Sequence, residues 1–199
     1  MNTLDKVAIT SRSFSTNKYL VEELRARYAN ITLNNSGKTL VGSELLEFLN
    51  WQNKVIVGLE NFDKNLIDQL PELKVISKFG VGLNNIDLES MKENSISLGF
   101  HPGTNKQSVA ELALMHIFIA LRKTPSSKED ISNNIWSQNK GHELFGKTIG
   151  IIGFGNIGQR LAELLEPFKC KIIFYDDIEF SKEELVDKFP SRSEDFINN

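Results

Sequence analysis

An apolar run that ends in a glycine-rich turn constrains the fold more than any other feature of this sequence. Residues 148–158 read TIGIIGFGNIG, so an apolar segment leads into the pattern G-x-G-x-x-G and then into a helical pattern. The first glycine permits a tight turn, the second lets a phosphate approach the backbone, and the third lets the helix pack close to the sheet. The new helix would direct free N–H groups and its positive dipole end toward an anion. The motif therefore predicts a pyrophosphate-binding turn formed by Gly153, Gly155, Asn156, Ile157 and Gly158.

Three features around the turn favour a dinucleotide over an ordinary glycine turn. The apolar run is β-branched, which is typical of a parallel strand buried on both faces. Apolar side chains then recur at helical spacing from Ile157 to Phe168. A second apolar run, 171–175, ends in Asp176, where a carboxylate would accept hydrogen bonds from the adenosine ribose. Asp176 favours NAD over NADP, because it would repel a 2′-phosphate and no Lys or Arg follows before Lys182.

Composition limits the partners and the environment. The chain has 199 residues, of which 40% are hydrophobic and 25% charged, with a net charge of −3 and no basic cluster. One or two globular domains fit this composition, and it gives no electrostatic reason to bind nucleic acid or an anionic membrane. The most apolar stretch, 109–121, is too short to cross a bilayer, and residues 1–6 lack the apolar core of a signal peptide. With a single cysteine, Cys170, which we expect to be buried and inert, we expect a cytoplasmic protein.

The first hundred residues alternate between strand and helix patterns, which predicts a parallel sheet covered by helices on both faces. The expected strands are 6–10, 30–33, 54–58, 73–77 and 96–98, and the expected helices are 16–28, 43–49 and 62–70. The sequence therefore predicts an α/β protein with a first domain at residues 1–100 and a second, nucleotide-binding domain at residues 101–199.

A long apolar helix is expected between these domains. Two adjacent segments, 104–107 and 108–111, both fit a capping box and would begin it. The helix is apolar on nearly every side, so it has to be buried all round, in a large core or against another subunit. We therefore expect the 105–122 helix to bridge the domains and to form a homodimer. The polar stretch 123–142 is expected as a loop held down by its only large aromatic side chain, Trp136.

The order of the motifs resembles the D-isomer-specific 2-hydroxyacid dehydrogenases, the family that includes D-3-phosphoglycerate dehydrogenase. The matching segments are LKVISKFGVGLNNID at 73–87, PGTN at 102–105, SVAE at 108–111, Trp136 with ELFGKT at 143–148, the glycine motif, and Tyr175-Asp176. The resemblance covers essentially the whole chain. It implies a flavodoxin-like substrate-binding domain followed by the start of a Rossmann NAD-binding domain. It also implies NAD as the cofactor and a small 2-hydroxy or 2-oxo acid as the substrate.

The resemblance assigns site residues as well. In the family, the backbone matching Gly80, Val81 and Gly82 faces the substrate carboxylate, and the position of Val81 also touches the cofactor. Small residues after a strand expose N–H groups that can bind an anion, which agrees with that role. The other cofactor contacts carry over to the glycine motif and to Asp176.

No catalytic residue is assigned in this chain. Hydride transfer at a 2-hydroxy acid needs a general base, a carboxylate that orients the base, and a cation for the substrate carboxylate. In the family these groups are a His, a Glu and an Arg that lie beyond the position of Asp176. Here His116 is expected to be packed or at an interface, His142 is expected to be solvated, and His101 borders the presumed cleft without a recognisable partner. No cluster has metal-ligand spacing.

Further expectations concern positions that depart from the family and the last residues. Asn84 stands where the family usually has Asp, and Phe100 where it has Asn, which bears on the substrate and the hinge. Residues 191–199 are expected to form the helix before a third nucleotide-domain strand, so the strand at 149–152 would keep a bare edge. We therefore expect the N-terminal part of a longer enzyme, marginally stable and without dehydrogenase turnover on its own.

Two other function classes stay open at this point. One is a non-catalytic NAD-sensing or protein-interaction module, because members of this broad family act as co-repressors. The other is a methyltransferase, because a glycine turn and an acidic residue after the second strand also suit S-adenosylmethionine. The third glycine of the motif and the G-V-G segment at 80–82 count against the methyltransferase.

Overall fold

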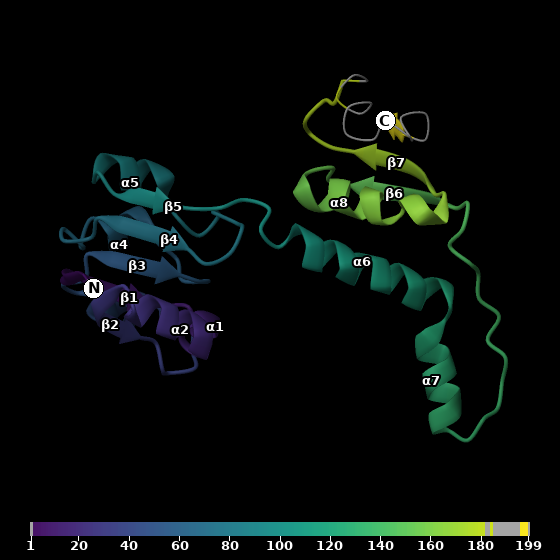
Figure 1. Ribbon diagram of the computed structural model, residues 1–199, viewed down its shortest axis with the longest axis horizontal. Coiled ribbons are helices and arrows are strands. Elements are labelled where there is room, and N and C mark those ends of the chain that lie inside the picture. Colours follow the sequence, from purple (N-terminus) through teal and green to yellow (C-terminus); the bar gives the residue numbers. More distant parts are fainter. Residues whose placement is uncertain (1, 182–183, 185–195, 199) are drawn as a thin grey trace. The chain divides into compact units, whose positions relative to one another are not determined.

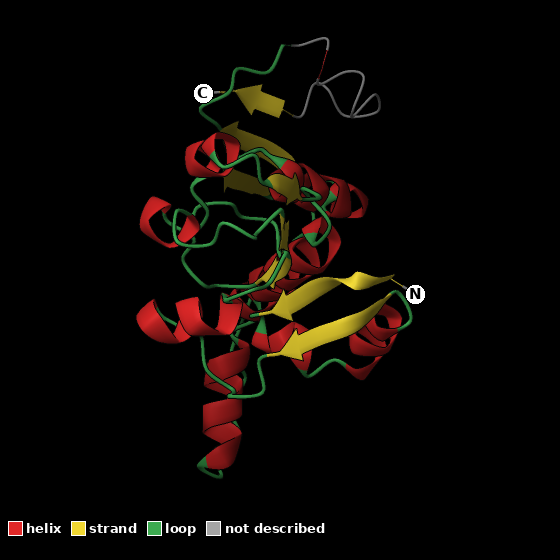
Figure 2. Ribbon diagram, turned by 90° about the vertical axis from the view of Figure 1, so that its left-hand side faces the viewer, coloured by secondary structure: helices red, strands yellow, loops and turns green. Residues whose placement is uncertain are grey.

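The chain folds into two compact units. The computed structural model describes residues 2–181, 184 and 196–198, and the units are Met1–Thr104 and Asn105–Asn199. The boundary follows Thr104, whereas the sequence places it after residue 100. Within each unit, helices lie beside a parallel sheet (Figure 1, Figure 2). The α/β class predicted from the sequence is therefore confirmed.

The first unit holds a five-stranded parallel sheet in the order β2-β1-β3-β4-β5 (Figure 1). This is the strand order of flavodoxin-like sheets, so the fold expected for this part is confirmed. The strands are β1 (Asn2–Ile9), β2 (Tyr28–Leu33), β3 (Lys54–Val57), β4 (Val75–Lys78) and β5 (Ser97–Gly99). The helices are α1 (Arg12–Ser15), α2 (Lys18–Arg25), α3 (Gly42–Leu49), α4 (Lys64–Ile67) and α5 (Leu88–Glu93).

Polar caps fix where four of these helices begin. The side chain of the cap accepts a hydrogen bond from the backbone N–H three residues on, at Ser11, Asn17, Asp63 and Asp87. Such a bond satisfies one of the N–H groups that a helix start leaves without a partner. The expected helix at 62–70 is consequently shorter, because Phe62 precedes the cap and pairs with Ile86 in an isolated bridge.

The sheet of the first unit has a hydrophobic core on each face, as the sequence predicts. Ala8, Val55 and Ile76 belong to one buried cluster. Val7 and Ile9, which flank Ala8 in β1, belong to a second cluster with residues of α1 and α2. Since successive side chains of a strand point to opposite faces, the two clusters lie on opposite sides of the sheet.

The second unit holds a three-stranded parallel sheet in the order β6-β7-β8. Its elements are α6 (Lys106–Leu121), α7 (Thr124–Ser132), β6 (Thr148–Ile152), α8 (Asn156–Leu164), the 3₁₀ helix η1 (Glu166–Phe168), β7 (Lys171–Tyr175) and β8 (Phe196–Asn198). Strands β6 and β7 and helix α8 confirm the expected start of a Rossmann fold. The helix expected at 191–199 is wrong at 196–198, which form a strand beside β7, and the rest of that segment lies outside the described residues.

Strand β6 is covered on one face only. Ile151 is 7% exposed and packs in a cluster with Ile172, Phe174 and apolar residues of α6 and α8. Ile152, which points the other way, is 92% exposed. The prediction of burial on both faces is therefore wrong for the part of the chain that the structure describes. In that part β6 pairs only with β7, so it is the edge strand that the sequence predicts.

Helix α6 is less buried than its sequence predicts. It begins after Asn105, whose side chain makes no capping bond, so neither expected capping box forms. One side packs against the cluster of the second unit, and Ala110 is the only buried residue of the helix. Leu112 and Met115 on the other side are 50% and 45% exposed. Burial all round is therefore wrong within this chain. Among the described residues no helix, α6 included, has the length and apolar character needed to cross a bilayer.

The polar stretch after α6 contains a helix that the sequence does not predict. Helix α7 has a proline, Pro125, in its first turn, where proline is favourable because its missing N–H is not needed. Its residues TPSSKEDIS show no apolar spacing, so a pattern based on burial cannot detect it. Trp136, expected to hold this stretch down, is 92% exposed and does not do so within the described residues.

Candidate functional site

The glycine turn of the second unit has the backbone geometry that its sequence predicts. Gly153 leaves β6 with φ +90°, a conformation that favours glycine, and its N–H donates to the carbonyl of Tyr175 at 2.8 Å. A β-carbon added to Gly158 would lie 2.2 Å from the carbonyl oxygen of Gly153. The third glycine is therefore required by close packing of α8 on the end of β6.

The start of α8 is open to an anion. A β-carbon at Gly155, the cap residue, would meet no atom within 4 Å, so the space beside this backbone is free of protein. In the described part of the chain the N–H groups of Asn156 and Ile157 have no protein acceptor, and no side chain caps the helix. Unpaired N–H groups and the helix dipole together make a phosphate site. Ile157 itself is 37% exposed.

Asp176 lies beside this turn and is bonded to it. It follows β7, and its Oδ2 accepts a hydrogen bond from the N–H of Phe154 inside the glycine motif. Its Oδ1 accepts from the N–H of Ile178 at 3.0 Å. Each oxygen of an ionised carboxylate can accept more than one hydrogen bond, so both can still bind hydroxyl groups. The sequence places Asp176 at the ribose position, and the structure brings it to the turn.

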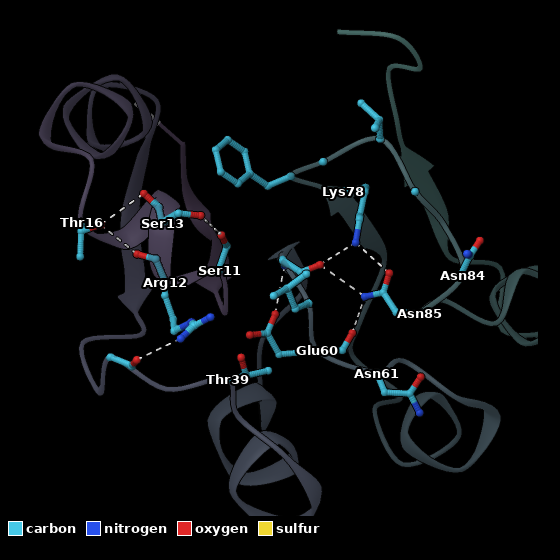
Figure 3. A pocket seen from close by; sticks show the side chains of 17 residues that line it. Ser11, Arg12, Ser13, Thr16, Thr39, Glu60, Asn61, Lys78, Asn84 and Asn85 are labelled. Atoms are coloured by element: carbon cyan, nitrogen blue, oxygen red, sulfur yellow. Dashed lines mark hydrogen bonds between the residues drawn. The ribbon is translucent and has the colours of Figure 1, made fainter. Parts of the chain in front are cut away.

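A large cavity lies in the first unit, at the carboxyl ends of β1, β3 and β4 (Figure 3). It has a volume of about 990 Å³. The strand order reverses between β1 and β3, and ligands of open α/β sheets bind at such switch points. The lining residues are Ser11, Arg12, Ser13, Thr16, Gly37, Thr39, Gly58, Leu59, Glu60, Asn61, Lys78, Phe79, Gly80, Val81, Gly82, Asn84 and Asn85.

The loop expected to bind substrate borders this cavity. Gly80, Val81 and Gly82 all line it, and Gly80 has φ +142°, where a residue with a side chain would be strained. In the described part of the chain none of these three backbone N–H groups donates to a protein acceptor. Such a row of free N–H groups suits a carboxylate. Asn84, which departs from the family pattern, lines the same cavity and is exposed.

Sequence reasoning missed the charged groups at the base of the cavity. Glu60 is 2% exposed, and its Oε2 accepts from the Thr10 hydroxyl at 2.8 Å and from the Gly58 N–H at 3.0 Å. Lys78 is half-buried, and burial lowers the pKa of its ammonium group although the charge of Glu60 opposes this. The only signal for these groups was their position directly after, or at the end of, a parallel strand.

The histidines are not arranged as a catalytic pair. His101, His116 and His142 are all exposed, so His116 is not packed within this chain, and its place at an interface stays a prediction. No ion pair in the described residues involves a histidine. The same residues contain no group of three or more His, Cys, Asp or Glu that could hold a metal ion. Cys170 is buried, as the sequence predicts.

Comparisons with known proteins identify relatives. A family model described as "D-isomer specific 2-hydroxyacid dehydrogenase, catalytic domain" matches residues 7–189. The chain is 40% identical over 114 residues to hydroxypyruvate reductase of Thermotoga maritima, covering 56% of this chain and 37% of that protein. It is 32% identical over 144 residues to D-3-phosphoglycerate dehydrogenase of Haemophilus influenzae, covering 70% of this chain and 35% of that protein.

A solved structure agrees with these relatives. The NAD⁺-bound 3-phosphoglycerate dehydrogenase of Entamoeba histolytica matches with a TM-score of 0.70 at 25% identity, covering 93% of this chain and 59% of that one. The chain spans less than half the length of these two curated relatives. The family model covers most of the chain, including the glycine turn and the loop at residues 79–85 within the matching segment 73–87, here called the signature loop. The chain belongs to the D-isomer specific 2-hydroxyacid dehydrogenase family.

Proposed function

We propose that this chain is the NAD-binding and substrate-carboxylate-binding part of an oxidoreductase that interconverts a 2-hydroxy acid and a 2-oxo acid. The observation that carries the proposal is the glycine turn with Asp176 bonded to it. A turn that combines unpaired N–H groups with an adjacent carboxylate offers one group for a pyrophosphate and one for a ribose. An ordinary structural turn would need neither.

NAD is the cofactor that this turn supports best. The N–H groups of Asn156 and Ile157 would hold the pyrophosphate, and Asp176 would accept hydrogen bonds from the ribose hydroxyls. Bound NAD would supply the acceptor for a hydride from the substrate. A 2′-phosphate would meet the negative charges of Asp176 and Asp177, so NADP should bind more weakly. From the family resemblance we also propose that Val81 touches the cofactor.

A small 2-hydroxy or 2-oxo acid is the proposed substrate. The free N–H groups of Gly80, Val81 and Gly82 would bind its carboxylate, and the cavity beside them would take the rest of the molecule. Several relatives are named for acids of this kind, among them the hydroxypyruvate reductase and the D-3-phosphoglycerate dehydrogenases. Polar and charged side chains in the lining, among them Arg12 and Lys78, suit a substrate that carries hydroxyl or anionic groups.

Turnover by this chain alone is not part of the proposal. No histidine of the described residues is paired with a carboxylate, so no general base is assigned. We propose that the chain binds NAD without oxidising substrate by itself. This observation also favours a second candidate function, a non-catalytic NAD-binding module that acts through other proteins. The sequence holds a single cysteine, which suits a reducing compartment, and we propose the cytoplasm.

Titration calorimetry of the 199-residue protein tests the proposal. NAD⁺, NADP⁺ and S-adenosylmethionine are titrated in parallel, and we expect heat of binding with NAD⁺, weaker binding of NADP⁺, and none with S-adenosylmethionine. Preferential binding of S-adenosylmethionine would refute the assignment as an oxidoreductase and favour a methyltransferase. Reduction of NAD⁺ is then followed by absorbance with a panel of 2-hydroxy acids, and turnover would refute the proposal that the chain is inactive alone.

We also propose that the exposed side of α6 is covered in a homodimer. Leu112 and Met115 are about half exposed, and an apolar cavity of about 430 Å³ lies beside Met115, Phe118 and Ile119. Burial of apolar surface contributes roughly 25 cal/mol per Å², so a second copy would stabilise this side of the helix. Sedimentation equilibrium tests the idea, and a monomer at every concentration would refute it.

A further inference from the structure

The loop that borders the cavity is held at its two ends and free between them. At one end the N–H of Phe79 donates to the carbonyl of Val57 at 2.9 Å. At the other end the carbonyl of Asn85 accepts from the N–H of Phe62 at 2.8 Å. Among the described residues no backbone hydrogen bond anchors residues 80–82 between these points. The position of the backbone at residues 80–82 relative to the cavity therefore depends on the side chains at the base of the loop.

Two side chains at that base bond to each other and to the turn after β3. The Lys78 ammonium donates to the Gly58 carbonyl at 2.5 Å and to Asn85 Oδ1 at 2.7 Å. The Asn85 amide donates to the Glu60 carbonyl at 2.6 Å. Figure 3 shows Lys78 and Asn85 directed toward each other and toward the Gly58–Glu60 turn. Lys78 precedes the free loop and Asn85 follows it, so these bonds close the loop across its base.

The environment of this contact strengthens its hydrogen bonds. Both side chains are half-buried, and Glu60 beneath them is 2% exposed and fixed by two hydrogen bonds of its own. Charge-assisted hydrogen bonds shielded from water are stronger than exposed ones. The Lys78 ammonium group donates two of its three N–H groups to protein oxygens. Its position is therefore fixed by the protein, unlike that of an exposed surface lysine.

We infer that Lys78 and Asn85 are positioning residues that clamp the signature loop, so that the N–H groups of Gly80, Val81 and Gly82 face the substrate carboxylate. The inference rests on the proposed function for the carboxylate, but the clamp itself is a property of the ligand-free protein. Neither residue has to touch the substrate in this role. The competing reading is that Lys78 acts as a cationic ligand of the substrate, in which case Asn85 would matter little.

The experiment measures loop order and anion affinity separately in the 199-residue protein. Amide NMR of the ligand-free protein reports the mobility of residues 79–85. Titration with oxalate, an unreactive dianion that resembles the carboxylate end of a 2-oxo acid, reports affinity in the presence of NAD⁺. The variants are Lys78→Met, Lys78→Arg, Asn85→Ala and the double variant Lys78→Met/Asn85→Ala. Lys74→Met is the matched control, because Lys74 is exposed and does not line the cavity.

We expect both Lys78→Met and Asn85→Ala to increase the mobility of the loop. Each should also lower the affinity for oxalate by about tenfold, which is the effect of one lost charge-assisted hydrogen bond. The double variant should bind oxalate more weakly than either single variant. Its fold-loss in affinity should nevertheless be smaller than the product of the two single fold-losses, because the two residues share one network. Lys78→Arg should restore most of the affinity. NAD⁺ affinity, and all properties of Lys74→Met, should stay within about twofold of the parent.

Each other result has a definite meaning. If Lys78→Met weakens oxalate and Asn85→Ala does not, Lys78 is a ligand and the clamp is refuted. Unchanged loop mobility in both variants refutes the clamp directly. If the parent does not bind oxalate but the variants loosen the loop, the clamp stands and the proposed substrate site fails. Should Lys78→Met not fold, Asn85→Ala and Lys78→Arg still decide between these outcomes.

Discussion

Replacing Gly158 with alanine tests whether close packing, rather than cofactor binding alone, requires the third glycine of the motif. The added β-carbon would lie 2.2 Å from the Gly153 carbonyl oxygen, 3.2 Å from the Gly153 carbonyl carbon and 3.2 Å from Ile151 Cγ2. Real β-carbons keep at least 3.0 Å from such atoms, so α8 would have to move away from β6 by about 0.8 Å. Two of the three contacts are to backbone, which cannot rotate aside.

The free energy of unfolding should fall by about 2 kcal/mol. Overpacking costs about 1–3 kcal/mol, and a contact with backbone lies toward the upper end of that range. Alanine inside a helix contributes about 1 kcal/mol in the opposite direction relative to glycine. A loss of this size is a large fraction of the about 5–15 kcal/mol that stabilises a typical domain.

Two other glycines serve as matched controls in urea unfolding followed by circular dichroism. A β-carbon at Gly150 in β6 or at Gly155 would meet no atom within 4 Å, so either alanine should change the free energy of unfolding by less than about 1 kcal/mol. Gly155→Ala should nevertheless weaken NAD⁺ in calorimetry, because its methyl group would occupy the space proposed for the pyrophosphate. A Gly158→Ala protein as stable as the parent would refute the packing argument. Full NAD⁺ affinity in Gly155→Ala would show that the pyrophosphate does not occupy that space.

Three further substitutions test other parts of the molecule. Asp176→Ala should lower the affinity for NAD⁺ by about tenfold and reduce the preference for NAD⁺ over NADP⁺, since a charge-assisted acceptor is lost. An unchanged ratio of the two affinities in calorimetry would contradict the proposed bond to the ribose. The cap bond from the Ser90 N–H lowers the pKa of Asp87, so its stabilisation is present above the ordinary aspartate pKa and is lost as pH falls through the lowered value. Asp87→Asn keeps a cap and should flatten that acid dependence in urea unfolding, and an unchanged pH profile would count against it. Met115→Glu should shift sedimentation toward monomer without changing NAD⁺ affinity, and a persistent dimer would place the interface elsewhere.

The parts of the site that the sequence predicts are local in the chain. The strand, the turn and the start of α8 follow from residues 148–158, because backbone conformation at a glycine turn is set by neighbouring residues. Asp176 could be placed beside this turn because parallel strands bring their carboxyl ends to the same edge. The parallel sheet of the first unit followed from βα alternation, and its flavodoxin-like fold followed from the family resemblance, whereas the strand order came from the structure. The family model then confirmed the resemblance.

Tertiary structure alone decided which side chains meet and which faces are covered. Thr10 and Glu60 are fifty residues apart in sequence but share a hydrogen bond, and no local pattern encodes that contact. Lys78 stands at the end of β4, and the Gly58 carbonyl that accepts from its ammonium group lies twenty residues away in the sequence. The apolar sequence of α6 fixed its hydrophobicity but not how much of it this chain covers. Local backbone preferences depend on residues that are close in the sequence, so they can be predicted from it. Burial and charge pairing depend on distances between segments that are far apart in the sequence, and only the folded sheet sets these distances.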